Sequence, residues 1–399
     1  MFGAELIALT TLGLVGLGVV ETWGHRRRLA GLPVRVHVNG TRGKSSLTRL
    51  VAAGLRQAGR PTCAKTTGTL PRMITPDGRE IPVFRPSRPN VSEQVRVVEV
   101  ARSLGAEALV IECMALQPSL QWLCEDKLVR ATHAVITNAR PDHLDVMGPG
   151  ADDVAWALCG MIPPRGRVFT AEVERLPILA AACRDRHATL VACTPEDVAA
   201  VTDKDLGRFG YTEHAENVAL ALKVLGDLGV RRDVALAGMW NVQPDPGALT
   251  TYVLDFFGRR VVFVNGFAAN DPVSTEHIWR TMTGRYADCQ KRIALFNCRA
   301  DRPERSVQLG HTYVAWPEAD HVVLMGSGAY LFARAAVKAG LDGSRLVFVE
   351  GQRVEEIFEV LLNLVDTSAM IMGLGNIGGL GLDLVRYFRN RSHPSGVIG

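Results

Sequence analysis

The feature that most constrains the fold is a short strand that runs into a glycine-rich loop and then into a helix. Val34, Val36 and Val38 alternate with polar residues, which is the pattern of a β-strand. The loop that follows, residues 39–46, reads Asn-Gly-Thr-Arg-Gly-Lys-Ser-Ser, and apolar residues then recur at helical spacing. This order is typical of loops that bind phosphates at a helix N-terminus. We therefore predict an α/β domain of the P-loop type that binds a nucleoside triphosphate.

The loop supplies the chemical groups that a triphosphate needs. Its glycines let the backbone close on the phosphates, Lys44 is expected to reach the β- and γ-phosphates, and Ser45 to ligate Mg²⁺. The common spacing of this motif requires a glycine at Val38, so the loop is a shortened variant. A chance Gly-Lys-Ser in a turn is the alternative, which the strand before the loop and the helix after it disfavour. The predicted ATP-binding residues are Gly40, Thr41, Arg42, Gly43, Lys44, Ser45 and Ser46.

Two further strands end in polar residues. The apolar run 108–111 is followed directly by Glu112, and the run 133–137 is followed by Asn-Ala-Arg-Pro-Asp-His-Leu-Asp at 138–145. In a parallel sheet, sites form at the carboxyl ends of the strands. A carboxylate directly after a buried strand is unusual unless it is paired or binds a metal. Glu112 alone fits a surface residue equally well, but the phosphate loop in the same sheet favours a metal site.

The motifs resemble those of the Mur ligase and folylpolyglutamate synthase family. Residues 39–46 look like its ATP loop, and 137–145 look like its Thr-Asn…Asp-His-Leu-Asp motif. Residues 214–217 resemble the segment whose asparagine meets adenine, and 295–302 resemble a segment with an Asp-Arg pair. The resemblance covers residues 33 to 310. Within the family it is closest to the ligase subunits of poly-γ-glutamate synthases, through residues 112–118 and 263–272.

This resemblance implies amide ligation driven by ATP through an acyl phosphate, with release of ADP. It implies catalytic roles for Lys44, Glu112, His143 and Arg302, and metal ligation by Ser45, Glu112 and His143. Mg²⁺, or Mn²⁺ in its place, is the expected metal. Asn138, Asn217 and Asp301 are further expected nucleotide contacts. Arg299, Arg302 and Arg305 are expected to close over the phosphates, although a solvated surface loop explains them as well.

One departure from the family concerns the metal site. Many members place a carbamoylated lysine after the Asp-His-Leu-Asp motif, but no lysine occurs between Lys127 and Lys204. The resemblance therefore leaves the second metal site open.

A second domain follows the turn-rich residues 243–247. Strand-like runs recur after it and alternate with helical segments, which predicts a smaller, Rossmann-like α/β domain. The runs are 261–264, 293–296, 321–325, 346–349 and 369–372. The predicted organisation is an anchor at 1–24, an ATP-binding domain at 25–247 and a ligase domain at 248–399. Residues 373–378 match a dinucleotide fingerprint locally, but the chain ends before the acidic strand end that such a site needs.

The N-terminus is predicted to be a transmembrane helix. Residues 6–20 carry no charge and would span about 22 Å as a helix, against about 30 Å of hydrocarbon, so the flanking residues are needed. Arg26–Arg28 follow the run, which is the reverse of a cleavable signal peptide and keeps the catalytic domains cytoplasmic. The alternative is an amphipathic or buried helix. Glycines at 13, 16 and 18 would allow close packing against a membrane partner.

Composition narrows the function classes. A net charge of +4 over 399 residues gives no reason to expect nucleic-acid binding, and eight cysteines without a CxxC pair indicate reduced thiols. A basic stretch could steer a polyanion, although a solvated loop is the simpler explanation; it contains Arg60, Lys65, Arg72, Arg79, Arg85 and Arg88.

The expected partners are glutamate, poly-γ-glutamate, integral-membrane subunits of a polymer synthase and export complex, and a second copy of the chain. The alternatives are a membrane-tethered ATPase, another Mur-type amino-acid ligase and an NAD-linked oxidoreductase.

Overall fold

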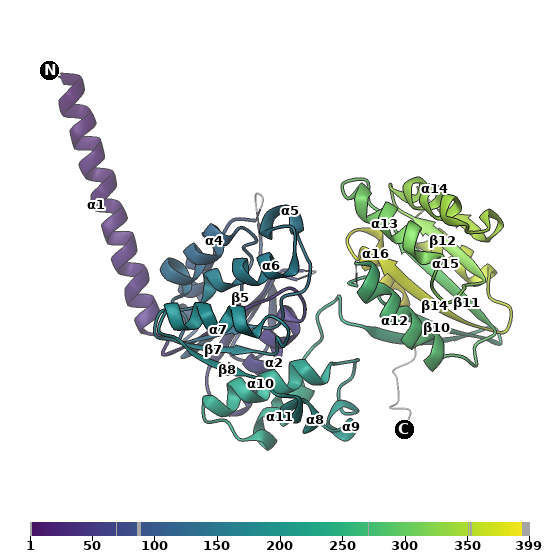
Figure 1. The fold of residues 1–399 in the computed structure, drawn as a ribbon, viewed down its shortest axis with the longest axis horizontal. Helices are drawn as coiled ribbons and strands as arrows, with labels where there is room; N and C mark the ends of the chain where they lie inside the picture. The colour runs from purple at the N-terminus through teal and green to yellow at the C-terminus, as the bar shows by residue number, and fades with distance from the viewer. Residues whose placement is uncertain are drawn as a thin grey trace. The chain divides into compact units, whose positions relative to one another are not determined.

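The computed structural model divides into two compact units, Met1–Gln243 and Pro244–Gly399, each built around its own sheet (Figure 1). The α/β class expected for both parts is confirmed, and most strand pairs are parallel, as predicted. The structure describes residues 2–68, 70–85, 89–269, 271–349, 351 and 353–392.

The first unit contains an eight-stranded sheet. Its strands are β1 Val34–Asn39, β2 Thr62–Thr66, β3 Arg72–Ile74, β4 Glu80–Pro82, β5 Ala108–Glu112, β6 His133–Ile136, β7 Arg167–Thr170 and β8 Thr189–Ala192. The order is β4-β3-β2-β5-β1-β6-β7-β8, and β3 and β4 form an antiparallel edge on an otherwise parallel sheet. Helices cover both faces, so the central strands are continuous apolar runs.

Helices of the first unit divide between the two faces of this sheet. They are α1 Phe2–Ala30, α2 Lys44–Gln57, α3 Glu93–Ser103, α4 Pro118–Leu123, the π-helix η1 Cys124–Val129, α5 Leu144–Met147, α6 Ala151–Leu158, the 3-10 helix η2 Cys159–Met161, α7 Leu176–Asp185, α8 Pro195–Ala199, α9 Asp203–Leu206, α10 Ala215–Asp227 and α11 Arg232–Trp240. One core contains Leu50 of α2 and Leu225 of α10. Another contains Leu29 of α1 and Val98 of α3. The first of these cores also contains Leu236 of α11, so α2, which follows the phosphate loop, packs against both α10 and α11.

The second unit is a six-stranded mixed sheet in the order β13-β12-β11-β14-β10-β9. Its strands are β9 Thr250–Phe256, β10 Arg259–Asn265, β11 Lys291–Asn297, β12 His321–Met325, β13 Leu346–Phe348 and β14 Ser368–Gly375. Its helices are α12 Pro272–Arg285, α13 Pro303–Tyr313, α14 Ala329–Ala339, the 3-10 helix η3 Gly343–Arg345, α15 Val354–Asn363 and α16 Leu380–Arg389. Each strand predicted for this half is present. The antiparallel edge strand β9 was not predicted.

The N-terminal helix α1 carries exposed apolar side chains along most of its length. Gly3–Ala30 is long and apolar enough to cross a membrane, and none of its most apolar stretch is buried. The alternative of a buried helix is therefore wrong. Leu6, Leu9, Leu12 and Val15 are exposed, and so are others between them, so the apolar residues surround the helix instead of forming one face. Near its C-terminal end, α1 packs against α3 through Leu29.

Candidate active site

The phosphate loop leaves β1 at Asn39 and enters α2 at Lys44. Its two glycines have backbone angles that other residues seldom adopt, with φ at 125° for Gly40 and 81° for Gly43. A Cβ at Gly40 would overlap the side chain of Thr137. The Nζ atom of Lys44 donates to the carbonyl of Gly40 at 2.6 Å, so the ammonium is held over the loop. The loop thus combines a cation with the N-terminus of a long, buried helix.

Two residues after β6 hold this loop in shape. The hydroxyl of Thr137 donates to the carbonyl of Arg42 at 2.6 Å, and Nδ2 of Asn138 donates to the same carbonyl at 3.3 Å. Oδ1 of Asn138 accepts from the hydroxyl of Thr41 at 2.6 Å and from the backbone N–H of Arg42 at 3.1 Å. The sheet register explains this contact, because β6 pairs with β1. Asn138 therefore lies at the loop, and its described contacts shape the loop backbone.

Ser45 and Glu112 meet beside the loop. The hydroxyl of Ser45 donates to Oε2 of Glu112 at 2.8 Å, and the backbone N–H of Thr67 donates to the same oxygen at 2.7 Å. Glu112 is 2% exposed, so the alternative of a surface residue is wrong. Because β5 pairs with β1, the end of β5 lies beside the start of the loop. A hydroxyl and a carboxylate are the oxygen ligands that Mg²⁺ prefers. Two of the three predicted metal ligands are thus in contact.

His143, the third predicted metal ligand, precedes α5 with a left-handed φ of 47°. Its Nε2 lies 3.9 Å from Oδ1 of Asp142, and Oδ2 of Asp142 accepts from Nη1 of Arg42 at 3.1 Å. Through Arg42, this motif is joined to the phosphate loop. In the part of the chain that the structure describes, no three His, Cys, Asp or Glu side chains are grouped so that they could hold a metal. Metal ligation by His143 remains a prediction.

Glu213 is a site residue that the sequence reasoning missed. It is 7% exposed and directly precedes the N-cap of α10. Its carboxylate accepts from the hydroxyl of Ser46, from the hydroxyl of Tyr211 at 2.9 Å and from Nδ2 of Asn217 at 2.9 Å. Burial, reinforced by the negative charge of Glu213, raises the pKa of Tyr211. A Cβ at Gly43 would come within 2.6 Å of Oδ1 of Asn217. Glu213 therefore ties the predicted adenine contact to the phosphate helix.

A buried ion pair lies behind the strand end that carries Glu112. Nδ1 of His37 is 2.7 Å from Oε2 of Glu125, and the side chains are 0% and 1% exposed. Burial opposes a charge on the imidazole, but hydrogen bonds with Cys113 and Glu125 outweigh it and raise the pKa of His37 to about 9. Hydrogen bonds from Cys124 and from His37 hold the pKa of the Cys113 thiol well below its usual value. Because Cys113 follows Glu112 directly, this network fixes the end of β5.

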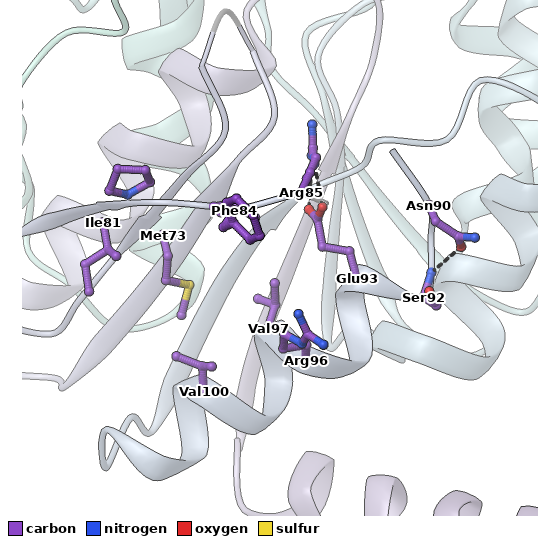
Figure 2. Close-up of a pocket in the computed structure, with 12 residues that line it drawn as sticks. Met73, Ile81, Phe84, Arg85, Asn90, Ser92, Glu93, Arg96, Val97 and Val100 are labelled. Atoms are coloured by element: carbon purple, nitrogen blue, oxygen red, sulfur yellow. Dashed lines mark hydrogen bonds and ion pairs between the residues drawn. The ribbon is translucent and has the colours of Figure 1, made fainter. Parts of the chain in front are cut away.

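The basic stretch after α2 is largely neutralised by acidic side chains. Lys65 is fully buried with Nζ 2.7 Å from Oε1 of Glu93, and Nε of Arg85 is 2.6 Å from Oε2 of the same carboxylate. Burial lowers the pKa of Lys65, and Glu93 opposes that shift. Figure 2 shows Arg85 and Glu93 facing each other at a cavity of about 450 Å³ beside α3. These two cations are therefore not free to steer a polyanion, and Arg88 lies outside the described residues.

The predicted residues of the second unit lie after β11. Arg299 and Asp301 form a bidentate ion pair with distances of 2.8 and 2.7 Å, and hydrogen bonds from Arg299 lower the pKa of Asp301. Arg302 is the N-cap residue of α13. Nη1 of Arg305 donates to Oδ1 of Asn376, after β14, at 2.8 Å. Arg305 is thus joined to the strand-end network of this unit, whereas the Arg299–Asp301 pair is exposed to solvent.

The glycine-rich residues 373–378 serve close packing. A Cβ at Gly373 would overlap the ring of Phe267, and Gly375 has a φ of 91° with the carbonyl of Asn297 next to it. Nδ2 of Asn297 donates to the carbonyls of Asn376 and Gly378 at 2.5 and 3.0 Å. The residues that match the dinucleotide fingerprint therefore contact other parts of the protein itself, such as Phe267 and Asn297.

Fold and site together define a Mur-type, ATP-dependent ligase. The Mur ligase middle domain matches residues 38–158, which contain the phosphate loop and Glu112. The fold is similar to folylpolyglutamate synthase of Mycobacterium tuberculosis, solved with ADP and AMPPCP (18% identity, TM-score 0.63, 92% of this chain and 96% of that one). It is also similar to the bifunctional folylpolyglutamate synthase/dihydrofolate synthase of Yersinia pestis, solved with AMPPNP and a Mn ion (14% identity, TM-score 0.66, 93% of this chain and 92% of that one).

Further comparisons give the family. The C-terminal domain of poly-γ-glutamate synthase CapB matches residues 250–391. The chain is 35% identical to the PGA synthase CapB of Bacillus subtilis (strain 168), over 95% of this chain and 96% of that protein. It is also 35% identical to the capsule biosynthesis protein CapB of Bacillus anthracis, over 95% of this chain and 82% of that protein. The chain belongs to the CapB family of poly-γ-glutamate synthases.

Proposed function

We propose that this chain is an ATP-dependent amide ligase that adds glutamate to a growing poly-γ-glutamate chain and releases ADP and phosphate. The observation that carries this proposal is the contact between Ser45 and Glu112 beside the phosphate loop, in a chain of the CapB family. A dinucleotide-dependent oxidoreductase fits poorly, because residues 373–378 are used in packing.

In the first step, a substrate carboxylate oxygen bonds to the γ-phosphorus of ATP while the bond from that phosphorus to ADP breaks. The product is an acyl phosphate. Negative charge gathers around the phosphorus, so cations and backbone N–H groups supply most of the stabilisation. Lys44 and the N-terminus of α2 provide both. Asn217, held by Glu213, meets the adenine.

The donor set at the end of β5 fits a divalent cation, Mg²⁺ or Mn²⁺. Ser45 and Glu112 would hold it, and a bound cation would neutralise charge on the phosphates. His143 is proposed as a ligand for a second cation, with Asp142 beside it to orient the imidazole.

In the second step, the amine of the incoming glutamate attacks the acyl carbon. The carbon–oxygen bond to phosphate breaks, phosphate leaves, and the amine loses a proton as the amide forms. Arg302 of the second unit, assisted by Arg299 and Arg305, is proposed to offset phosphate charge, and Asp301 to contact the nucleotide.

We also propose that α1 is a single membrane span that leaves both units in the cytoplasm, because Arg26–Arg28 follow the apolar run. A cytoplasmic ligase by itself does not move a polyanion across a bilayer. Integral-membrane partner subunits of a synthase and export complex are therefore expected, and a homo-oligomer is compatible with α1.

The test is to incubate the full chain, in detergent, with Mg-ATP, glutamate and hydroxylamine. Trapping of an acyl phosphate gives glutamyl hydroxamate and an equal amount of ADP. Release of AMP, or steady ATP turnover without hydroxamate, would overturn the acyl-phosphate mechanism. The second of these outcomes favours the tethered ATPase instead.

Matched variants check the site. Lys44→Ala should abolish hydroxamate formation, whereas Lys127→Ala, which removes an exposed lysine on η1, should leave it unchanged. Equal activity of the two variants would contradict the role of the loop.

A further inference from the structure

Two cavities flank the last turns of α1. The larger, about 870 Å³, lies between residues 20–28 of α1, helix α3 and residues 126–130. The smaller, about 420 Å³, lies between α1, residues 125–131 and Pro163–Pro164. Both are lined by Arg26, Asp126 and Arg130. Neither contains a residue of the proposed active site.

The base of α1 is firmly joined to the first unit. Nε2 of His25 donates to the carbonyl of Leu128 at 2.9 Å, and Nη2 of Arg28 is 3.0 Å from Oε1 of Glu99. Leu29 is buried in the core shared with α3. Because α1 is one continuous helix from Phe2 to Ala30, the larger cavity has a fixed position along the proposed span.

That position corresponds to the lipid headgroups. The exposed apolar side chains of α1 continue to Val20 and Trp23. From Trp23 to Arg28 the helix rises about 7.5 Å, while the headgroup layer on each side of a bilayer is about 5–7 Å thick. Trp23 is 62% exposed, and Trp122, 42% exposed, lies 5.4 Å from Nζ of Lys127. Exposed tryptophans of this kind are enriched at membrane interfaces.

The charges of the larger cavity favour an anion. Its lining holds five basic and three acidic residues, besides His25. Glu99 and Asp126 are neutralised by Arg28 and Lys127. Three of the lining arginines, Arg26, Arg96 and Arg130, form no ion pair with any residue that the structure describes. Arginine suits phosphate especially well, because its planar guanidinium donates two parallel hydrogen bonds.

We propose that the larger cavity binds the phosphate headgroup of an anionic phospholipid in the leaflet from which α1 emerges. The proposal rests on the proposed span, but not on the ligase chemistry. A lipid held there would fix which face of the first unit lies against the membrane. The active-site edge would then keep a constant orientation toward integral-membrane partners.

The test is native mass spectrometry of the full chain in detergent, with phosphatidylglycerol or phosphatidylcholine added at equal concentration. We expect retained adducts to favour phosphatidylglycerol, and the double variant Arg96→Ala, Arg130→Ala to reduce that preference about tenfold. The matched control is Arg184→Ala, Arg389→Ala, which removes two exposed arginines elsewhere. Equal retention of both lipids, or the same loss in the control, would overturn the proposal.

Two further measurements separate the sources of failure. If millimolar inorganic phosphate displaces phosphatidylglycerol, the cavity is a general anion site and the lipid proposal is wrong. Extraction of the chain from membranes by alkaline carbonate would refute the span, and the headgroup site with it. Hydroxamate formation in detergent is unaffected by either result, so ligase function is judged independently.

Discussion

At the scale of the residue, one carboxylate oxygen organises the proposed metal site. Oε2 of Glu112 accepts from both Ser45 and Thr67. Glu112→Gln keeps the size of the side chain but removes its charge, so a divalent cation bound with ATP would lose an anionic ligand. We expect the hydroxamate rate to fall about 100-fold or more, measured at saturating ATP, with circular dichroism to confirm folding. The control is Glu107→Gln, because Glu107 is an exposed glutamate that directly precedes β5. Full activity of Glu112→Gln would refute the metal assignment.

Glu213 is expected to act as a positioning residue for the nucleotide. In Glu213→Gln, hydrogen bonds from Ser46, Tyr211 and Asn217 lose a charged acceptor. Such bonds contribute about 1.5–3 kcal/mol each, and much of this is recovered by a neutral acceptor. We therefore expect the KM for ATP to rise about tenfold with a smaller change in kcat. Glu216→Gln, exposed on the same helix, should leave both unchanged. A folded Glu213→Gln protein with an unchanged KM contradicts this role.

The two glutamates also show what the sequence could predict. Glu112 was predictable, because it directly follows a buried strand and shares a sheet edge with the phosphate loop. Glu213 was not, because its contact with Ser46 joins residues 167 positions apart and arises only when α10 packs on α2. Lys65 was assigned to a solvated basic loop, but β2 places it inside the sheet, opposite Ile111 of β5.

At the scale of the element, the long apolar strands were predicted and the short edge strands were not. β1, β5 and β6 are flanked by parallel partners, and burial on both faces produces a continuous apolar signal. β3 and β4 have three residues each, and β4 is the terminal strand at this edge of the sheet, with β3 between it and β2. Such strands carry too few residues for a periodic pattern. The mixed character of the first sheet was therefore not visible in the sequence.

The phosphate loop yields a prediction at this scale. Gly40→Ala places a Cβ against Thr137 at a φ of 125°, so the loop must move away from β6. We expect ATP affinity to fall at least tenfold, with about 1–3 kcal/mol lost from the free energy of unfolding. Gly59→Ala is a matched control, because Gly59 also has a positive φ, 79°, but open space around it. It should lower stability without weakening ATP binding, as measured by calorimetry. Equal ATP affinity in the two variants would contradict this account of the loop.

At the scale of the whole molecule, the proposed membrane anchor α1 and the ATP-binding sheet belong to one unit. α1 ends in the core that it shares with α3, and α3 precedes β5, whose last residue is Glu112. The second unit follows at Pro244 and carries its own core. The sequence predicted an anchor at 1–24 apart from the ATP-binding domain and gave no sign that this helix is joined so closely to the first sheet. That junction depends on His25 and Arg28, which as sequence are only part of a basic run.

The orientation of α1 can be tested by labelling introduced cysteines, because the chain's own cysteines should react little with the label. All eight are buried, so a membrane-impermeant maleimide should label the natural chain weakly. Gly3→Cys and Ser103→Cys both introduce a thiol at an exposed position, at opposite ends of the proposed topology. In intact spheroplasts we expect labelling of the first variant alone, and after lysis labelling of both. Labelling of Ser103→Cys before lysis would place the catalytic units outside, away from ATP, and would contradict both the span orientation and the ligase in its proposed compartment.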